Sequence, residues 1–318
     1  MSEGARYRLY GITLETSWAL KTPLREANGE PDLRFSVSST EPGPGVWAPE
    51  PGFTDPGDDG SEPAVGRIGG HTVVRFPMVG DAWFVTDHEI VFHLTHPEYD
   101  FYVEMILLGI LLAYWLEQRG FTALHASAAA RGGWAIGIMG PNGAGKTSLS
   151  LDLVDRGFHL MTDDLLAVSG QSEAPTAHPG FPQVRLWPDE AVERFGSIAG
   201  LEKAHPLYEK LRIPLTAQPF PTEPAKLMGL YVRTPTQTSN IDITPVTGPD
   251  ALFNLMFNSF ALGLLDVPQA RERWIKRLGA LLGQVPLFTV SPSDDRPATA
   301  DLVAEHASSL AAQSNLSG

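Results

Sequence analysis

Gly140-Pro-Asn-Gly-Ala-Gly-Lys146-Thr147 matches the pattern G-x-x-x-x-G-K-[ST] in full. Its glycines allow the backbone to take left-handed turns and to approach a phosphate chain closely. Successive N–H groups, together with the start of a following helix, then form a site for anions. A lysine at this position can reach the β- and γ-phosphates, and the threonine hydroxyl can ligate Mg²⁺. The stretch therefore predicts ATP and Mg²⁺ as cofactors.

The residues around this motif predict the context that a nucleotide site needs. Residues 134–139 are apolar and predict a buried strand that runs into the loop. Residues 147–156 predict a helix, and Gly157 is suited to the position just after its end. Residues 158–161 predict a second strand, which ends close to Asp163-Asp164. The residues expected to contact the nucleotide are Gly140, Asn142, Gly143, Ala144, Gly145, Lys146, Thr147 and Ser148.

The two adjacent aspartates are expected to carry different parts of the chemistry. Neighbouring side chains in a strand point to opposite faces, so one can face Mg²⁺ and the other an acceptor. Phosphoryl transfer needs charge neutralisation, alignment and a base for the hydroxyl proton. We expect Asp163 to be the base and Asp164 to lie on the metal side. The reverse assignment stays open, as does a purely structural turn or cap role for one of them.

A histidine and three basic residues complete the candidate site. His125 lies fifteen residues before Gly140, and a hairpin around Arg131-Gly-Gly133 would bring it beside the loop. The alternative is a buried histidine without a chemical role. Arg185 is expected to stabilise the transferred phosphate, and Lys210 and Arg212 are further candidates. For any one of these three, a surface ion pair is the competing interpretation.

Composition restricts the compartment and the partners. The chain has no cysteine and a formal net charge of −14, so disulfides and thiolate metal sites are excluded and nucleic acid is not expected as a partner. The N-terminus lacks the apolar segment of a signal peptide. The longest apolar run, residues 105–116, is too short to cross a bilayer and predicts a buried helix. We therefore expect a cytoplasmic protein with no membrane partner.

The pattern of elements predicts an α/β fold with two domains. Residues 1–99 form the expected β-rich N-terminal domain, with strands at 72–76, 82–85 and 89–93 and an exposed Pro/Gly-rich loop at 41–63. Residues 100–318 form the expected catalytic domain, a mixed sheet flanked by helices that contains the phosphate-binding loop. Its predicted elements include an apolar helix at 102–119, a loop at 170–182, and helices at 250–265, 268–282 and 298–312.

The motifs together resemble the catalytic core of the HPr kinase/phosphorylase family, which is related to the phosphoenolpyruvate carboxykinases. The resemblance is carried by Leu124-His-Ala-Ser127, by the loop 140–147, and by Arg156-Gly-Phe-His-Leu-Met-Thr-Asp163-Asp164. It covers residues 120–170 well. Residues 179–188, Pro-Gly-Phe-Pro-Gln-Val-Arg-Leu-Trp-Pro, are similar to the next element of stand-alone relatives, including kinases found with lasso-peptide biosynthesis. The resemblance implies the fold of the HPr kinase C-terminal domain.

The resemblance also implies an activity. It implies an ATP- and Mg²⁺-dependent kinase that phosphorylates a hydroxyl, either a serine of a peptide or protein or a small metabolite. His125 would lie near the transferred phosphate, and Asp163 would be the base. The bacterial relatives resemble ring-forming hexamers, so the resemblance implies a homo-oligomer. One departure is Gln183, which stands where the bacterial regulator has a metal-binding glutamate. Glutamine is a poorer ligand for Mg²⁺ than a carboxylate is, which weighs against a second metal and against the reverse phosphorylase reaction.

Two other classes of function were weighed. The main alternative is an ATP-binding regulatory protein with little or no turnover, and Gln183 is the observation that favours it. The other is a different class of phosphate-loop enzyme, such as a transport ATPase or a nucleotide kinase. The chain shows no L-S-G-G-Q element and no arginine-rich lid, so this class is not favoured.

Overall fold

The computed structural model describes residues 4–51, 53, 62–170, 174–234, 241–265, 268–291 and 295–316. The chain divides into two compact units. The first unit comprises Met1–Trp115 and Ala261–Trp274, and the second comprises Leu116–Phe260 and Ile275–Gly318. The domain boundary expected between residues 99 and 100 stays a prediction.

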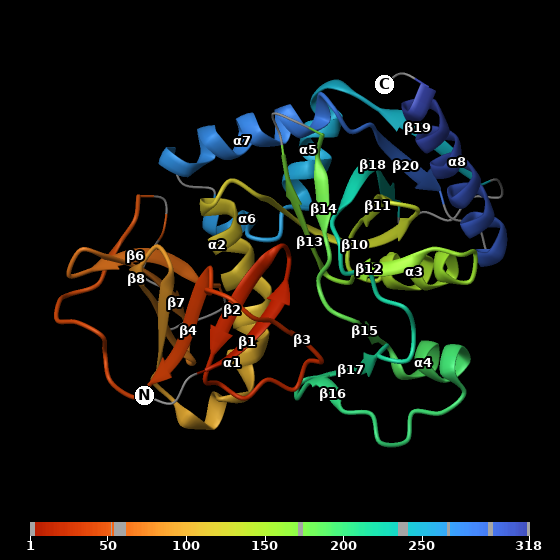
Figure 1. Ribbon diagram of the computed structural model, residues 1–318. Helices are drawn as coiled ribbons and strands as arrows, with labels where there is room; N and C mark the ends of the chain where they lie inside the picture. The colour runs from red at the N-terminus through yellow and green to blue at the C-terminus, as the bar shows by residue number, and fades with distance from the viewer. Residues whose placement is uncertain are drawn as a thin grey trace. The chain divides into compact units, whose positions relative to one another are not determined.

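The first unit is built on one sheet. Among the described residues, nine strands pair in the order β3-β1-β2-β4-β9-β8-β7-β6-β5 (Figure 1). All neighbours are antiparallel except β2–β4 and β4–β9, which are parallel. The strands are β1 (Ala5–Leu9), β2 (Ile12–Thr16), β3 (Arg25–Glu26), β4 (Leu33–Ser38), β5 (Ala48–Pro49), β6 (Ala64–Ile68), β7 (His71–Phe76), β8 (Gly80–Thr86) and β9 (Glu89–Leu94). The three strands predicted at 72–76, 82–85 and 89–93 are therefore present, while β6 was not predicted. The loop predicted at 41–63 contains β5, and its residues 52 and 54–61 lie outside the described residues.

The apolar segment after this sheet forms a helix with one irregular turn. A short helical turn, η1 (Pro97–Tyr99), leads into α1 (Phe101–Ile106), then into η2 (Leu107–Leu111), and then into α2 (Leu112–Gln118). Gly109 inside η2 has non-helical φ and ψ of −104° and −111°. By length and composition, Phe101–Gln118 is the one helix in the described part of the chain that could cross a membrane. Because 67% of it is buried, it has the character of a core helix of a soluble α/β protein.

The second unit contains a large mixed sheet. Its described strands pair in the order β11-β10-β13-β14-β18-β20-β19, β12 pairs with β10, and β11 also pairs with β18. β11–β18 and β18–β20 are parallel, and the other pairs are antiparallel. The strands are β10 (Thr122–Arg131), β11 (Trp134–Met139), β12 (His159–Thr162), β13 (Leu165–Ser169), β14 (Thr176–His178), β18 (Ala225–Arg233), β19 (Asp242–Val246) and β20 (Leu287–Ser291). The predicted hairpin around residues 131–133 is confirmed, because Arg131 pairs with Trp134 and Ala126 with Met139.

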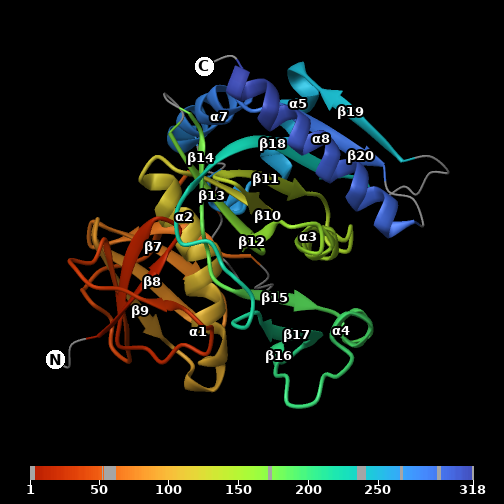
Figure 2. The same ribbon diagram turned by 45° about the vertical axis from the view of Figure 1, so that its right-hand side comes forward.

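Two helices cover one face of this sheet (Figure 2). They are α3 (Lys146–Val154) and α8 (Arg296–Leu316). Leu149 and Leu153 of α3 and Val303 of α8 are essentially buried in one apolar cluster with residues of β10, β11, β18 and β20. Burying such side chains is the main favourable term for folding, at about 1.5–3 kcal/mol for each large one. The result is the mixed α/β architecture that the sequence predicted.

A smaller layer lies next to α3. Its sheet has the order β15-β17-β16, with β15 (Gln183–Leu186), β16 (Lys203–His205) and β17 (Tyr208–Pro214), and it is accompanied by α4 (Pro188–Phe195). Val184, Leu186 and Ile213 of this layer share an apolar cluster with Leu151 of α3. The three strands were not predicted.

Two predicted elements are interrupted in the structure. The helix predicted at 250–265 is divided into α5 (Gly248–Phe257) and α6 (Leu262–Leu265), because the backbone at Asn258 and Phe260 bonds to β10 instead of continuing the helix. The loop predicted at 170–182 contains β14, which pairs with both β13 and β18. Residues 171–173 lie outside the described residues. The predicted helix at 268–282 is α7 (Pro268–Leu282).

Candidate functional site

Most of the residues singled out from the sequence meet around one small cavity in the second unit. The cavity has a volume of about 90 Å³, room for about three water molecules. Its lining is His125, Asn142, Gly143, Gly145, Lys146, Thr147, Ser148, Asp163, Asp164, Arg185, Leu186, Trp187, Glu190 and Lys210. Gly140 and Ala144 belong to the same loop but do not line the cavity, and neither does Arg212.

The glycine loop, residues 140–147, joins β11 to α3 through left-handed turns. Gly140, Gly143 and Gly145 have φ values of +142°, +81° and +76°, which an L-residue adopts only with strain. Among the described residues, the amides of Asn142 and Gly143 donate to no protein group. Because these N–H groups are left for a ligand at the start of a helix, the loop can accept an anion.

Lys146 is the most buried cation of the cavity, with 8% of its surface exposed. Its Nζ donates hydrogen bonds to the carbonyls of Gly140, at 2.8 Å, and of Pro141, at 3.4 Å. Burial lowers the pKa of Lys146, and the nearby carboxylates of Asp164 and Asp163 partly oppose that shift. A phosphate chain in the loop would replace these carbonyls as the partner of the ammonium group.

Asp163 is held by three donors and has little free surface, with 6% exposed. Its Oδ1 accepts hydrogen bonds from the hydroxyls of Ser127, at 2.6 Å, and Thr147, at 2.9 Å. Its Oδ2 accepts one from the backbone N–H of Arg185 at 3.2 Å. Burial raises the pKa of Asp163, the charge of Asp164 raises it further, and the three hydrogen bonds oppose this. The carboxylate is therefore fixed beside the hydroxyl that the sequence assigned to the metal.

Asp164 is the more accessible of the two acids, and its side chain is 33% exposed. Its backbone is left-handed, with φ of +78°, in the turn between β12 and β13. Oδ2 accepts a hydrogen bond from Arg185 Nη1 at 2.6 Å, and Oδ1 lies 3.6 Å from His125 Nδ1. Burial alone would raise the pKa of Asp164, but the charges of Arg185 and His125 lower it overall. The two carboxylates have different partners, and the chain turns at Asp164 instead of continuing as the strand that the sequence suggested.

His125 is fixed by its own backbone and ring. Its ring Nδ1 lies 3.1 Å from the carbonyl oxygen of Asp164. Its backbone N–H donates to the carbonyl of Asn258 at 2.6 Å. The ring of Phe260 meets it edge-on, with centroids 5.4 Å apart. The imidazole therefore lines the cavity beside the more accessible acid.

The opposite wall of the cavity comes from β15, α4 and β17. The Ser148 hydroxyl donates to Glu190 Oε1 at 3.1 Å, and Glu190 Oε2 accepts a hydrogen bond from the N–H of Trp187, which begins α4. Lys210 Nζ lies 5.6 Å from the centre of the Trp187 ring. Sequence reasoning named Lys210 but not Trp187 or Glu190, although Pro188, a residue favoured at the first position of a helix, marks the helix start beside them.

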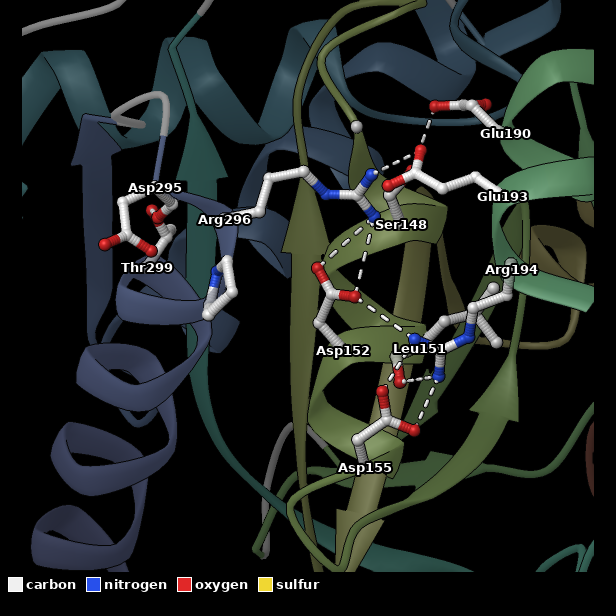
Figure 3. A network of polar contacts seen from close by, with 12 residues as sticks. Ser148, Leu151, Asp152, Asp155, Glu190, Glu193, Arg194, Asp295, Arg296 and Thr299 are labelled. Atoms are coloured by element: carbon white, nitrogen blue, oxygen red, sulfur yellow. Dashed lines mark hydrogen bonds and ion pairs between the residues drawn. The ribbon is translucent and has the colours of Figure 1, made fainter.

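A network of charges joins α3 to α4 and α8 (Figure 3). Arg194 of α4 donates to Asp155 at 2.6 and 2.8 Å and to Asp152 at 3.3 Å. Arg296 at the start of α8 lies 3.5 Å from both Asp152 and Glu193. These contacts lie along α3, the helix that begins with Lys146. They therefore hold the wall that carries Glu190 against the helix that follows the glycine loop.

The oxygen atoms around Thr147 fit a magnesium ion that is completed by phosphate and water. Mg²⁺ is usually held by one or two protein oxygens plus substrate phosphates and water, and Thr147, Asp163 and Asp164 offer a hydroxyl and two carboxylates. In the described part of the chain, no group of three or more His, Cys, Asp or Glu residues could hold a metal by itself. Gln183 is 3% exposed, its Oε1 has no hydrogen-bond partner among the described residues, and it does not line the cavity.

Comparisons with known proteins found similarity among solved structures. No protein-family model matches the chain, and no curated protein matches it. Among solved structures, the chain is similar to the Hpr(Ser) kinase/phosphatase from Coxiella burnetii. The TM-score is 0.33, the sequence identity is 12%, and the match covers 61% of this chain and 94% of that chain. A likeness of this degree carries no argument about activity, so the proposal below depends on the residues themselves.

Proposed function

We propose that this protein is a kinase that transfers the γ-phosphate of ATP, with Mg²⁺, to a hydroxyl. The observation that carries the proposal is the presence of two differently held acids at one glycine loop. Asp163 is buried against the Thr147 hydroxyl at 2.9 Å, and Asp164 is accessible beside His125 and Arg185. Binding a nucleotide needs the loop and a metal-side acid, and an accessible second acid beside a histidine and an arginine supplies the groups that transfer needs in addition.

The environments of the two acids support the reverse of the assignment first expected from the sequence. Both oxygens of Asp163 already accept hydrogen bonds from protein donors, so this carboxylate is poorly placed to take a proton from an acceptor. It is better suited to orient Thr147 and the water ligands of Mg²⁺. Asp164 is the more accessible acid, with 33% of its side chain exposed, so its carboxylate can be reached by an acceptor hydroxyl. We therefore assign Asp163 to the metal side and Asp164 to the base.

The proposed step follows from these assignments. Asp164 accepts the proton of the acceptor hydroxyl as its oxygen forms a bond to the γ-phosphorus, while the bond from that phosphorus to the β-bridging oxygen breaks and ADP leaves. Lys146 and Arg185 stabilise the negative charge on the phosphoryl oxygens. His125 orients or stabilises the same group. Mg²⁺, when bound, neutralises charge on the β- and γ-phosphates.

The acceptor is proposed as a class only. It is a serine of a peptide or protein, or a hydroxyl of a small metabolite, and nucleic acid and membrane are not proposed as partners. A cytoplasmic location and a homo-oligomeric state belong to the same proposal. Lys210 and Trp187 also line the cavity, and we propose that the acceptor binds next to them.

The test is acceptor-dependent formation of ADP. The protein is incubated with Mg²⁺ and ATP labelled at the γ-phosphate, together with a panel of serine peptides and hydroxylated metabolites. We expect label transfer to at least one acceptor, and we expect Asp164→Asn to abolish transfer while Mg-nucleotide binding is retained. Intact binding with no transfer to any acceptor would instead support the alternative, an ATP-binding regulatory protein. That alternative is favoured by one observation, the burial of Gln183 outside the cavity.

A further inference from the structure

Asn258 is a buried side chain that joins the end of α5 to the first residue of the glycine loop. It is 8% exposed, and its Oδ1 accepts a hydrogen bond from the N–H of Gly140 at 3.0 Å. Its Nδ2 donates to the carbonyl of Asn254, one turn earlier in α5, at 2.8 Å. Because both ends of the amide are satisfied, the orientation of this side chain is fixed.

The backbone around Asn258 also holds the strand that carries His125. The carbonyl of Asn258 accepts the N–H of His125 at 2.6 Å, and the N–H of Phe260 donates to the carbonyl of Ala123 at 2.9 Å. The Phe260 ring then lies edge-on against the His125 ring. Two residues of one short segment are thus bonded to the strand on both sides of Leu124.

These contacts continue the backbone pairing just where the β10–β11 ladder stops. The last pair of that ladder is Ala126 with Met139. The next residues beyond this pair are His125 and Gly140. The backbone N–H of Gly140 donates to the side-chain oxygen of Asn258, and the backbone N–H of His125 donates to its carbonyl oxygen. Asn258 therefore sets the distance between the glycine loop and His125 at the point where the pairing of β10 with β11 has ended.

The far end of the loop has a second support. Arg233, at the end of β18, donates from Nη1 to the carbonyl of Gly145 at 2.8 Å. The loop is therefore held at its first glycine and at its last, while the amides of Asn142 and Gly143 between them donate to no group in the described ranges. A loop held in this way is already shaped for its ligand, which reduces the ordering cost of binding.

We propose that Asn258 is a positioning residue that holds the glycine loop in its phosphate-binding shape and at a fixed distance from His125. The proposal rests on the proposed function only in taking the loop's ligand to be a nucleotide phosphate chain. The competing interpretation is that Asn258 does no more than end α5. If Asn258 only ended the helix, its substitution would lower the stability of the fold. If it positions the loop, its substitution also weakens nucleotide binding by more than the loss of stability explains.

The chain offers a matched control on the same helix. Asn254 is also an asparagine, and its side-chain Nδ2 donates to the carbonyl of Asp250. Asn254→Ala removes that local hydrogen bond and keeps the Asn254 carbonyl that receives Asn258. Comparing Asn258→Ala with Asn254→Ala therefore separates the contact with Gly140 from the loss of an amide on α5.

The experiment measures MgADP binding by calorimetry and the thermal midpoint without nucleotide, for the full chain and both variants. We expect Asn258→Ala to weaken MgADP binding by about tenfold, the effect of leaving one buried N–H without its acceptor. We expect Asn254→Ala to bind within twofold of the unmodified chain at a similar thermal midpoint. Equal MgADP affinity in Asn258→Ala and Asn254→Ala would overturn the proposal.

A second measurement uses the unmodified protein, in case Asn258→Ala does not fold. Amide hydrogen exchange without nucleotide should show the N–H of Gly140 protected and that of Gly143 exchanging fast. Fast exchange at Gly140 would overturn the proposal. Neither measurement needs turnover, so a chain that binds MgADP through an Asn258-dependent loop but transfers no phosphate would refute the kinase proposal and leave this inference standing.

Discussion

The Thr147 hydroxyl donates a hydrogen bond of 2.9 Å to Oδ1 of Asp163, an oxygen that also accepts the Ser127 hydroxyl at 2.6 Å. This contact joins the first turn of α3 to the residue that follows β12, and it is why we assign Asp163 to the metal side. Asp164, the next residue, turns away and pairs with Arg185 at 2.6 Å. Two adjacent acids thus have different partners on either side of one left-handed residue, Asp164.

Exchanging each acid for its amide should give two different kinetic defects. Asp163→Asn should raise the Mg²⁺ concentration needed for half-maximal nucleotide binding, because an amide orients Thr147 and metal-bound water less well than a carboxylate does. Asp164→Asn should leave Mg-nucleotide binding within about threefold and lower turnover by about 10²-fold or more, the usual effect of losing a general base. Mg²⁺ titrations of nucleotide binding, read beside turnover, distinguish the two.

Arg185→Ala is a third variant for comparison, because it removes the cation that bonds Asp164 and leaves both carboxylates in place. It should lower turnover while leaving the Mg²⁺ requirement unchanged. If Asp163→Asn instead retained the Mg²⁺ requirement and Asp164→Asn raised it, the first assignment from the sequence would be the correct one.

Lys146→Met should abolish nucleotide-dependent activity and leave the fold intact. The methionine side chain fills the space of the lysine stem, and Lys146 bonds within the loop only to the carbonyls of Gly140 and Pro141. Its burial already lowers its pKa, so removing the ammonium group should not lower the thermal midpoint by more than a few degrees. Circular dichroism melting checks that the fold is intact, and an ATP-binding assay checks the loss of nucleotide binding. Normal turnover in Lys146→Met would contradict the proposed role.

Local patterns predicted the parts of the site that lie close together in the chain. The strand before the loop, the helix after it and the turn at Gly157, whose φ is +84°, follow from hydrophobic periodicity and glycine placement. The hairpin that brings His125 to the loop followed from Arg131-Gly-Gly133. These elements could be predicted because each is set by neighbours within about twenty residues.

The parts that sequence reasoning missed are set by contacts between distant residues. Asn258 meets Gly140 across 118 positions, and no local pattern distinguishes it from Asn254. β15 was missed because its four residues have too few alternations to show a period, and β17 because only Leu211 and Ile213 of its seven residues are buried. The split of the predicted helix at 250–265 has the same cause, because tertiary hydrogen bonds at Asn258 replace helical ones.

The second unit should lose stability as the pH rises from about 4.5 to about 7. Glu117 is 2% exposed, and burial raises its pKa from 4.5 to about 7, partly opposed by Arg277 at 2.7 Å. A carboxyl with a raised folded-state pKa stabilises the fold below its unfolded pKa, and this contribution is lost as pH rises through the folded value. The shift corresponds to a change on the order of 3 kcal/mol.

Urea unfolding between pH 4.5 and 7.5 measures this change. Glu117→Gln cannot titrate, so its free energy of unfolding should vary less over the window than that of the unmodified chain. Glu209→Gln is the control, since Glu209 forms an exposed pair with Lys203 and such pairs contribute little. An equal pH dependence in Glu117→Gln and the unmodified protein would show that Glu117 is not the group responsible.

Alanine at two glycines of the loop should separate backbone strain from a side-chain clash. Gly143 and Gly145 have similar φ values, +81° and +76°, so alanine at either carries a similar strain of about 1–2 kcal/mol. A Cβ at Gly143 meets nothing within 4 Å, whereas a Cβ at Gly145 would lie 2.7 Å from Nη1 of Arg233. Gly145→Ala should therefore displace Arg233 and weaken MgADP binding more than Gly143→Ala does. Calorimetric titration of both variants measures the difference, and equal affinities would show that the contact between Arg233 and the loop does not affect binding.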